Sequence, residues 1–509
     1  MTPDQEFDYF ARQTNPDLSR RTFLSWAGRM GLGSAVAATG AATVGGGLLS
    51  ACSHRGPQVL PPEPPLPDTI KVGVIAPFTG IGAFVGDIVD RSLKAAEQEI
   101  NSKGGIGGRK VQVILRDTGQ DPAKGPSSYD ELSKMDGMAG ILWCAGLGFD
   151  ATYAAIRDDK YPIMAVFNDL QTSGKLYPNG DTPGRSVFQF FIPQDLHIDV
   201  LAEYAVKDRG YKTASLLNEK LLDTTGGARK SFEASCKKWG LENVGIEDYG
   251  VLDVDFGAQL GRLEKKKPHC LFVSGPLSKT TATLVKQLYQ RGSDYIDRPA
   301  AMSTKRWRPH IFGAPGASGD KSWVELADAD QPGAAKVGTL TVWHVGGLVY
   351  LPTFSISKWV KQYTGKDVTG GEESPADALA TLLYGVKAAG TLDRERLVEA
   401  IETMGNIKFS SIEFGFTPDR HLSKTRDDLT LVTMERKRGP EKTDPAYELG
   451  QEWTSGAIPF PASPTQLVRP TLAANLRAHP DVMKLIMDGK WGTHCTVDGA
   501  RLVPDCELH

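Results

Sequence analysis

The sequence predicts an α/β protein of two doubly wound parallel-sheet lobes, joined by a three-crossing hinge and followed by a C-terminal appendage. Two observations predict this fold: short apolar runs alternate with amphipathic stretches from Ile70 onward, and the same rhythm restarts near Thr213. Short apolar runs are typical of buried strands, and apolar residues spaced at three and four positions are typical of helices. Their alternation at this spacing predicts right-handed βαβ units on parallel sheets.

The first round contains five expected strands and the helices between them. Strands are predicted at 70–78, 111–115, 139–144, 162–167 and 187–192, and helices at 86–101, 126–135, 151–158 and from the last strand to about 208. Within 86–101, Val89, Leu93, Ala96 and Ile100 lie on one helical stripe, and a cluster of glycines at 104–108 ends the helix. This pattern predicts one complete lobe.

The second round begins with the same alternation and then changes. Strands are predicted at 213–217, 245–249 and 271–274, with helices at 228–239, 256–265 and 281–290. After an insertion at 300–308, we expect strands at 311–312 and 337–345, helical stretches at 353–363 and 375–404, and a hairpin of 412–417 with 429–435. The hinge crossings are expected near Ile192, within 276–312 and near Trp343.

The first fifty residues have the composition of an export signal. A twin-arginine run at 19–24 is followed by a mildly apolar stretch rich in Gly and Ala, which is the order of a Tat signal. The stretch ends at 49–52 in Leu-Ser-Ala-Cys, which resembles a lipobox. A transmembrane anchor is the alternative, but three consecutive glycines at 45–47 disfavour a membrane helix. We therefore predict Tat export and lipid anchoring of Cys52 at the outer face of the cell membrane, with a Pro-rich linker at 53–68.

The remaining cysteines are an odd set for an oxidising compartment: Cys144, Cys236, Cys270, Cys495 and Cys506. Cys495 and Cys506 flank a turn signal between two short extended runs, so they are candidates for a hairpin disulfide. At least one thiol is expected to stay free. No spacing matches a Cys-x-x-Cys site, and we expect neither a metal nor a cofactor.

The charge balance argues against nucleic-acid binding. The chain has 58 basic and 61 acidic residues, a formal net charge of -3, and no long run of Lys or Arg. A protein that binds nucleic acid needs a basic stripe to follow the phosphates. We therefore expect no nucleic-acid partner.

The segment 70–122 resembles a known family. It combines the first strand, Thr79, Gly80 and Phe84, the run Asn-Ser-Lys-Gly-Gly-Ile-Gly-Gly at 101–108, and Asp-Thr-Gly-Gln-Asp-Pro at 117–122. These residues are similar to type I periplasmic binding proteins of the branched-chain amino acid ABC transporter group, and the resemblance extends to about residue 439. It implies the extracytoplasmic substrate-binding component of an ABC importer. Such a component takes a small organic solute between two lobes and has permease subunits as partners.

These patterns divide the chain into five parts. Residues 1–52 form the signal, 53–68 the linker, 69–193 with 310–345 the N-terminal lobe, 194–309 with 346–439 the C-terminal lobe, and 440–509 the appendage.

The sequence gives no sign of an enzyme. It contains no His-Glu-x-x-His, no Walker motif and no Gly-x-Ser-x-Gly elbow, so no catalytic residues are assigned. A ligand-sensing module for a signalling partner remains an alternative, because it shares the cleft and differs only in its partner. A periplasmic hydrolase is the second alternative, and it requires His197 or His344 beside an activated Ser or Cys.

Candidate ligand-binding residues follow the strands, because doubly wound sheets bind ligands at the carboxyl ends of their strands. An ordinary loop or helix-capping role is the alternative for each of them. The candidates are Thr79, Phe84, Gly146, Leu147, Gly148, Phe149, Asn168 and Asp169 in the first lobe, and Asn218, Glu219, Asp223 and Lys279 in the second.

The resemblance also bears on the ligand. In amino-acid-binding members, hydroxyl groups follow the third strand and a second-lobe carboxylate binds the α-ammonium, whereas this chain has the run 146–149 and Lys279 in the matching places. A lysine repels an ammonium group, although Glu219 or Asp223 could supply the acid. We expect a carboxylate without an α-ammonium, or a larger, partly apolar or aromatic compound stacked on Phe84 or Phe149, ahead of a branched-chain amino acid.

Overall fold

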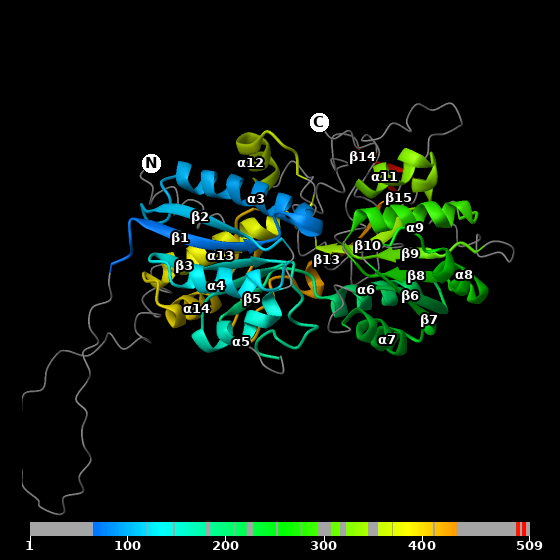
Figure 1. The fold of residues 1–509 in the computed structure, drawn as a ribbon, viewed down its shortest axis with the longest axis horizontal. Coiled ribbons are helices and arrows are strands. Elements are labelled where there is room, and N and C mark those ends of the chain that lie inside the picture. The colour runs from blue at the N-terminus through cyan, green and yellow to red at the C-terminus, as the bar shows by residue number, and fades with distance from the viewer. Residues whose placement is uncertain are drawn as a thin grey trace, which may run out of the picture. The chain divides into compact units, whose positions relative to one another are not determined.

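The computed structural model describes residues 65–434, 495–498 and 501–504, except for the gaps 120, 146–147, 180–183, 208, 221–226, 251–252, 276, 294–306, 316–321, 345–354, 369 and 411–412. Its compact unit begins at Asp68. Within it, helices pack on two separate sheets (Figure 1).

The first lobe is a parallel five-stranded sheet in the order β2-β1-β3-β4-β5. Its strands are β1 (Thr69–Ala76), β2 (Lys110–Asp117), β3 (Met138–Cys144), β4 (Ile163–Val166) and β5 (Val187–Gln189), and its first helices are α3 (Ala83–Ser102), α4 (Lys124–Ser133) and α5 (Phe149–Asp159). Every residue of β3 is buried, as expected for a central strand covered on both faces. The hydrophobic core of this lobe includes Ile75, Ile141 and Trp143.

The second lobe is a six-stranded sheet in the order β13-β10-β9-β8-β6-β7. The strands are β6 (Thr213–Glu219), β7 (Glu242–Tyr249), β8 (Cys270–Val273), β9 (His310–Gly313), β10 (Thr339–His344) and β13 (Leu429–Met434), and only β13 is antiparallel to its neighbour. The helices are α6 (Gln194–Lys207), α7 (Gly227–Trp239), α8 (Gly257–Lys266), α9 (Ser278–Gln290) and α11 (Ser322–Asp330). Leu217, Leu271 and Trp323 lie in its core.

The described segments after residue 310 lie mostly in the opposite lobe from the one predicted for each. Strands β9 and β10 extend the second sheet from β8, so assigning 310–345 to the N-terminal lobe was wrong. Helices α12 (Ser355–Thr364) and α13 (Glu373–Ala389) pack on α3 of the first lobe, and α14 (Arg394–Thr403) packs on α13 (Figure 1). Assigning all of 346–439 to the C-terminal lobe was therefore also wrong. An apolar run predicts a buried strand, but it does not say which sheet edge the strand joins.

The α/β fold with three hinge crossings is confirmed, although one crossing lies elsewhere. The chain changes lobe between β5 and α6, between β10 and α12, and between Leu422 and β13. The crossing expected within 276–312 does not occur there, because α9 and β9 both belong to the second lobe. The first and second crossings lie near the predicted positions.

Two local predictions also need correction. The strand β13 does not form a hairpin with the segment before it: β12 (Glu413–Phe414) pairs with β11 (Ile407–Lys408), while β13 pairs with β10. The helical stretch 375–404 is two helices, because Gly390 takes a left-handed conformation and the Asp393 side chain caps α14 by accepting from the Arg396 amide.

The C-terminal appendage contributes one described feature, an antiparallel pair of β14 (Cys495–Asp498) and β15 (Arg501–Pro504). The backbone of Cys495 lies opposite Pro504. Cys506 and Cys52 lie outside the described residues, so the disulfide and the lipid anchor remain predictions. Among the described helices, none is long and apolar enough to cross a membrane.

Candidate ligand-binding site

Two residues other than glycine have a left-handed backbone conformation at the carboxyl edge of the first sheet. Ala145 follows β3 with a φ of 48°, and Phe167 follows β4 with a φ of 57°. The positions are adjacent, because the Ala145 amide donates to the Val166 carbonyl at 2.9 Å. Such conformations cost roughly 1–3 kcal/mol and are concentrated at functional sites. This strained pair marks the edge as a candidate ligand-binding edge.

Thr79 follows β1 at the same edge and is held by Asp117 at the end of β2. The Thr79 hydroxyl donates to Asp117 Oδ2 at 2.5 Å, and the amides of Phe78, Thr79 and Gly119 donate to Asp117 Oδ1 at 2.8–3.1 Å. Burial raises the pKa of Asp117, but these hydrogen bonds outweigh it and leave the pKa below its usual value. The carboxylate therefore orders the loop, and Thr79 remains exposed.

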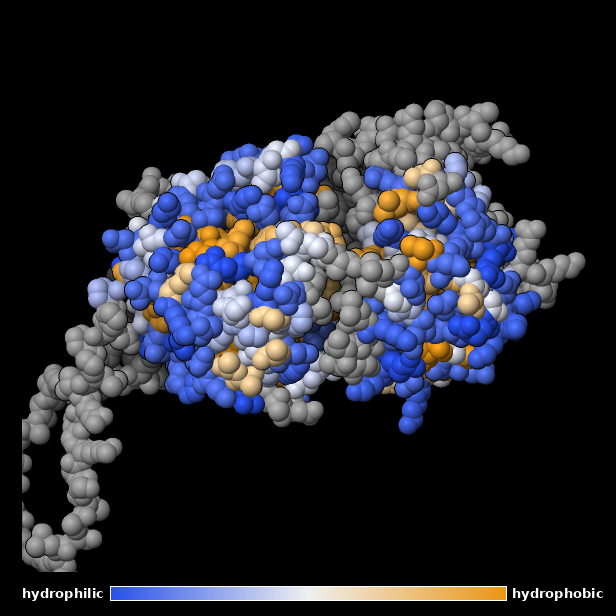
Figure 2. All heavy atoms as spheres, in the orientation of Figure 1, coloured by the Kyte–Doolittle hydropathy of each residue, from blue (hydrophilic) through white to orange (hydrophobic). Residues whose placement is uncertain are grey.

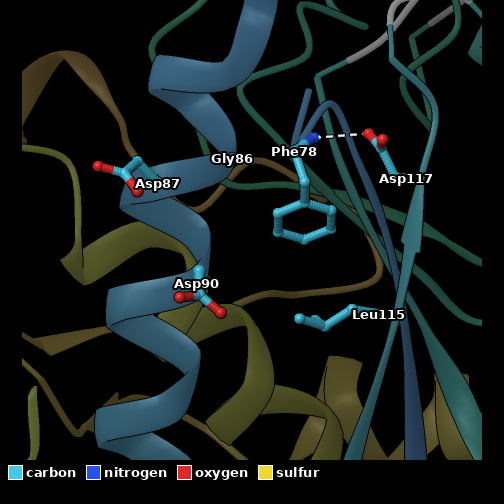
Figure 3. Close-up of a pocket in the computed structure, with 6 residues that line it drawn as sticks. All are labelled: Phe78, Gly86, Asp87, Asp90, Leu115 and Asp117. Carbon is cyan, nitrogen blue, oxygen red and sulfur yellow. Dashed lines mark hydrogen bonds between the residues drawn. The ribbon is translucent and has the colours of Figure 1, made fainter. Parts of the chain in front are cut away.

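An open hollow of about 440 Å³ adjoins this loop. It is lined by Phe78, Gly86, Asp87, Asp90, Leu115 and Asp117. Figure 3 shows the Phe78 ring between α3 and β2, above Leu115, with Asp90 on the facing helix. The three carboxylates already have partners, since Asp87 pairs with Arg91 at 3.0 Å, Asp90 pairs with Lys94 at 2.7 Å and Asp117 binds backbone amides. The hollow contains none of the predicted ligand-binding residues.

Gly148 and Phe149 have structural roles at the start of α5. A Cβ on Gly148 would lie 2.5 Å from the Cα of Gly125 in α4, so the absence of a side chain permits close helix packing. The Phe149 ring is 3% exposed and makes an edge-to-face contact with Trp143 at 5.2 Å. The expectation that a ligand stacks on Phe149 is therefore not supported. Because the run Gly-Leu-Gly-Phe also suits a tight turn into a helix, the sequence alone did not separate these roles.

Asn168 and Asp169 are tied to the backbone around β4. The Asn168 side-chain amide donates to the Trp143 carbonyl at 2.8 Å and to the Val166 carbonyl at 3.1 Å. Asp169 Oδ2 accepts from the amide of Gln194, the first residue of α6, at 2.8 Å. Asp169 thereby links the first lobe to the helix that begins the second. Both residues act as the loop and capping alternative describes.

In the second lobe, Asn218 and Glu219 belong to a buried hydrogen-bond network at the end of β6. Ser274 Oγ donates to Asn218 Oδ1 at 3.1 Å and accepts from the Glu219 amide at 2.8 Å. The Asn218 side-chain amide donates to Asp248 at 3.2 Å. Glu219 is 1% exposed, and a Cβ on Gly275 would lie 3.1 Å from its Cβ. These hydrogen bonds tie the ends of β6, β7 and β8 together.

Two further candidates, Lys279 and Phe84, are exposed, as Thr79 is. Lys279 is the second residue of α9 and is exposed beyond the end of β8. Phe84 is the second residue of α3 and is 39% exposed. Gly146, Leu147 and Asp223 lie outside the described residues. Figure 2 shows the hydrophobic surface as separate small patches on a mostly hydrophilic face.

The structure thus brings Thr79 and Asn168 to the first edge and Asn218, Glu219 and Lys279 to the second. Sequence reasoning did not single out Ala145, Phe167 or Ser274 as site residues. No sequence signal marks a left-handed alanine or phenylalanine, because both residue types ordinarily occupy other regions. The Ser274 role could be anticipated from its position directly after a buried strand.

The structure gives no support to hydrolase chemistry at His197. Its Nε2 lies 3.1 Å from the Gly313 carbonyl, and burial lowers its pKa to about 4. A ring nitrogen that donates to a backbone carbonyl is not available as a base for a nucleophile. The side chain of His344 lies outside the described part of the chain. Within that part, no group of three or more His, Cys, Asp or Glu could hold a metal ion.

Two doubly wound lobes joined by three crossings are the architecture of two-lobed binding proteins. The family model for periplasmic binding proteins matches residues 69–438. The chain therefore belongs to the periplasmic binding protein family, whose members are extracytoplasmic solute-binding proteins rather than enzymes. The resemblance found in the sequence is thereby confirmed.

Individual relatives agree with this family. The chain is 24% identical over 361 residues to the Leu/Ile/Val-binding protein BraC3 of Rhizobium johnstonii, covering 69% of this chain and 88% of that protein. A Streptococcus pneumoniae branched-chain amino acid binding protein in complex with isoleucine superposes with a TM-score of 0.56 at 17% identity, covering 76% and 100% of the two chains. A Rhodopseudomonas palustris solute-binding protein in complex with 3,4-dihydroxybenzoic acid has a TM-score of 0.56 at 19% identity, covering 74% and 94%.

Proposed function

We propose that this protein captures a small organic solute between the carboxyl edges of its two sheets and delivers it to an ABC importer. The observation that supports this proposal most directly is the strained pair Ala145 and Phe167. Two adjacent left-handed residues other than glycine in neighbouring strand-end loops are explained by a site whose loop geometry matters more than local stability. Permease subunits are the proposed partners.

The proposed solute is a carboxylate without an α-ammonium or an aromatic acid. Lys279 is exposed in the first turn of α9, where it adds to the positive end of the helix dipole. At the same sheet edge, the acidic candidate Glu219 is buried next to Gly275. Solved structures of this fold contain amino acids as well as aromatic acids, since one contains isoleucine and another contains 3,4-dihydroxybenzoic acid.

A thermal-shift screen of the purified protein tests the ligand class. The panel contains leucine, isoleucine, valine, 3,4-dihydroxybenzoate, 4-hydroxybenzoate and short dicarboxylates. A ligand at a hundred times its dissociation constant adds about 2.7 kcal/mol of stability. We expect the aromatic acids or simple carboxylates to give this shift. If only the branched-chain amino acids stabilise the protein, the proposed ligand class is wrong and the family's amino-acid role stands.

Two variants test whether Lys279 contributes to solute binding. Lys279→Ala should weaken carboxylate binding roughly tenfold or more, because a charge-assisted contact is lost. Lys265→Ala removes an exposed lysine on α8 and should leave the affinity unchanged. Equal affinities in the two variants would remove Lys279 from the site.

Tat export and lipid anchoring at Cys52 are also part of the proposal. They are supported by the twin-arginine run and the lipobox-like residues ahead of the Pro-rich linker. Cys52→Ala should leave the chain soluble or uncleaved when cell membranes are fractionated. Normal processing and full membrane retention of this variant would refute anchoring through Cys52.

A further inference from the structure

The third hinge crossing is fixed to the first lobe at His421. The His421 carbonyl accepts from the Gln189 amide at 2.8 Å, next to the end of β5. Its buried ring lies between two acceptors, with Nδ1 3.1 Å from the Val187 carbonyl and Nε2 3.0 Å from Glu402 Oε1. Glu402 also pairs with Arg185. These contacts hold one end of the crossing in place.

The other end of the crossing is fixed to the second lobe at Arg426. Its guanidinium forms ion pairs with Asp199 and Glu203 on α6, the first at 2.6 Å. Thr425 caps the following turn by exchanging hydrogen bonds with Asp428. Within this crossing, a rotation of one lobe against the other must therefore be absorbed by the few residues between these anchors.

Lys424 lies between the two anchors and is 1% exposed. Within the described structure its Nζ has no hydrogen-bond partner, and it lies over the Phe414 ring, 5.0 Å from the ring centroid. An ammonium group carries three donors. Leaving them unsatisfied in a buried position costs several kcal/mol unless another interaction offsets the loss. A lysine kept at this position therefore requires an explanation.

Asp377 on α13 is the complementary group. It is also 1% exposed, and its Oδ1 accepts from the Ser410 amide at 3.0 Å and the Ser410 hydroxyl at 2.7 Å. Its Oδ2 is buried and has no hydrogen-bond partner in the described part of the chain. Burial raises the pKa of Asp377 to about 6, the positive charge of Lys424 opposes this rise, and Glu373 adds to it. The two charges thus act on each other without forming an ion pair.

We propose that Lys424 and Asp377 form a hinge latch: a buried ion pair that is open in the arrangement described here and closes in a second arrangement of the lobes. A small change of the backbone between the anchors moves Lys424, whereas Asp377 stays fixed on α13 by Ser410. The arrangement that closes the latch gains the charge-assisted bond that this one lacks. The latch therefore biases the equilibrium between the two arrangements. It concerns the hinge and does not depend on the identity of the solute.

Electron–electron distance measurements test the latch without any ligand. Nitroxide labels at Lys94→Cys and Lys237→Cys report the separation of α3 and α7, both at exposed positions. The background replaces Cys52, Cys495 and Cys506 by serine, and the remaining cysteines are buried. We expect two distance populations. Lys424→Met and Asp377→Asn should each reduce the second population roughly fivefold or more, and the double variant should reduce it no further.

The surface pair Lys361 and Asp367 supplies the control. Their side chains are exposed and 2.9 Å apart on the same lobe, so Lys361→Met and Asp367→Asn should leave both populations unchanged. Asp377→Asn retains an oxygen for the Ser410 bonds and tests the latch even if Lys424→Met does not fold.

Acidification gives a second readout that a merely structural role would not produce. Protonating Asp377 removes the acceptor charge, so the second population should fall between pH 7.5 and 5 in the wild type and stay constant in Asp377→Asn. Three charged or titratable groups interact with Asp377. Lys424 lowers its pKa and Glu373 raises it, while the Asp377 charge raises the pKa of Tyr384. A single population that neither variant nor pH changes overturns the latch. Because no solute is present, that result would leave the proposed function untouched.

Discussion

The two lobes share one βαβ plan but build their strand-end loops differently. At the first edge, Ala145 and Phe167 occupy left-handed conformations that suit glycine. At the second edge, Gly275 takes the positive φ of 103° and Ser274 closes a buried hydrogen-bond network. Among the described residues, the first edge therefore retains backbone strain, whereas the second has a glycine at its positive-φ position beside a hydrogen-bonded serine. Among the described residues, strain at the first edge and not at the second indicates that the first edge has been shaped at the expense of stability.

The largest effect is expected where backbones touch in the first lobe. Gly148→Ala would place a Cβ 2.5 Å from the Gly125 Cα, and neither helix backbone can yield cheaply. We expect a loss of about 3 kcal/mol in the free energy of unfolding. Gly261→Ala on α8 is the control, since nothing lies within 4 Å of its added Cβ, and it should gain up to about 1 kcal/mol. Equal denaturation midpoints would refute the packing role.

The lobes should respond to acid in opposite directions. Asp377 in the first lobe has a folded pKa raised to about 6 by burial, so its contribution to stability falls as pH rises from about 4 to 6. His197 in the second lobe has a folded pKa lowered to about 4 by burial, so stability is lost as pH falls from about 6.5 to 4. Each effect amounts to roughly 3 kcal/mol at most.

Denaturation curves between pH 4 and 7 separate the two groups. Asp377→Asn should remove the contribution that makes the folded protein more stable at low pH. The free energy of unfolding should then fall more steeply on acidification. His197→Gln should remove the opposite contribution, which makes the folded protein less stable at low pH. Identical pH profiles in the two variants would show that neither shift is present.

The sequence predicted the elements well because the two periods, two for strands and about 3.6 for helices, come from backbone geometry. It misplaced 310–345 and most of 346–439 because lobe membership depends on which sheet edge is open. Strand β8 pairs with β9, with Cys270 opposite His310, and so continues the second sheet. That choice depends on distant contacts, which a local pattern does not contain.

A smaller effect is expected within the hydrogen-bonded edge of the second lobe. Ser274→Ala removes an acceptor for the Glu219 amide and a donor to Asn218, both in a buried setting. We expect a loss of about 2 kcal/mol in a urea titration. Ser127→Ala, at an exposed serine whose hydroxyl donates to the Ala123 and Lys124 carbonyls at the start of α4, should change stability by less than about 0.5 kcal/mol. If both losses are equally small, the edge is not held by this network.

The smallest effect should come from relieving strain at the first edge. Ala145→Gly removes one methyl group and lets the left-handed conformation form without steric cost. We expect a gain of up to about 1 kcal/mol in stability. Solute affinity should fall, because the loop becomes less ordered before binding. A less stable variant with unchanged affinity would mean that the strain has no functional role.

The candidate site was harder to predict than the fold. Thr79 and Lys279 remain exposed at strand ends as expected, whereas Phe149 and Gly148 proved to be packing residues. Glycine and phenylalanine near a helix start suit both ligand contact and close packing. The two roles differ only in what surrounds the residue, and the sequence does not specify those surroundings.

Small-angle scattering of the wild-type protein with and without the solute found in the thermal-shift screen tests solute capture between the lobes most directly. Hinge-bending binding proteins close over their ligand, so the radius of gyration should fall at saturating solute. An unchanged radius of gyration, measured with a solute that stabilises the protein by the expected amount, would contradict capture by lobe closure.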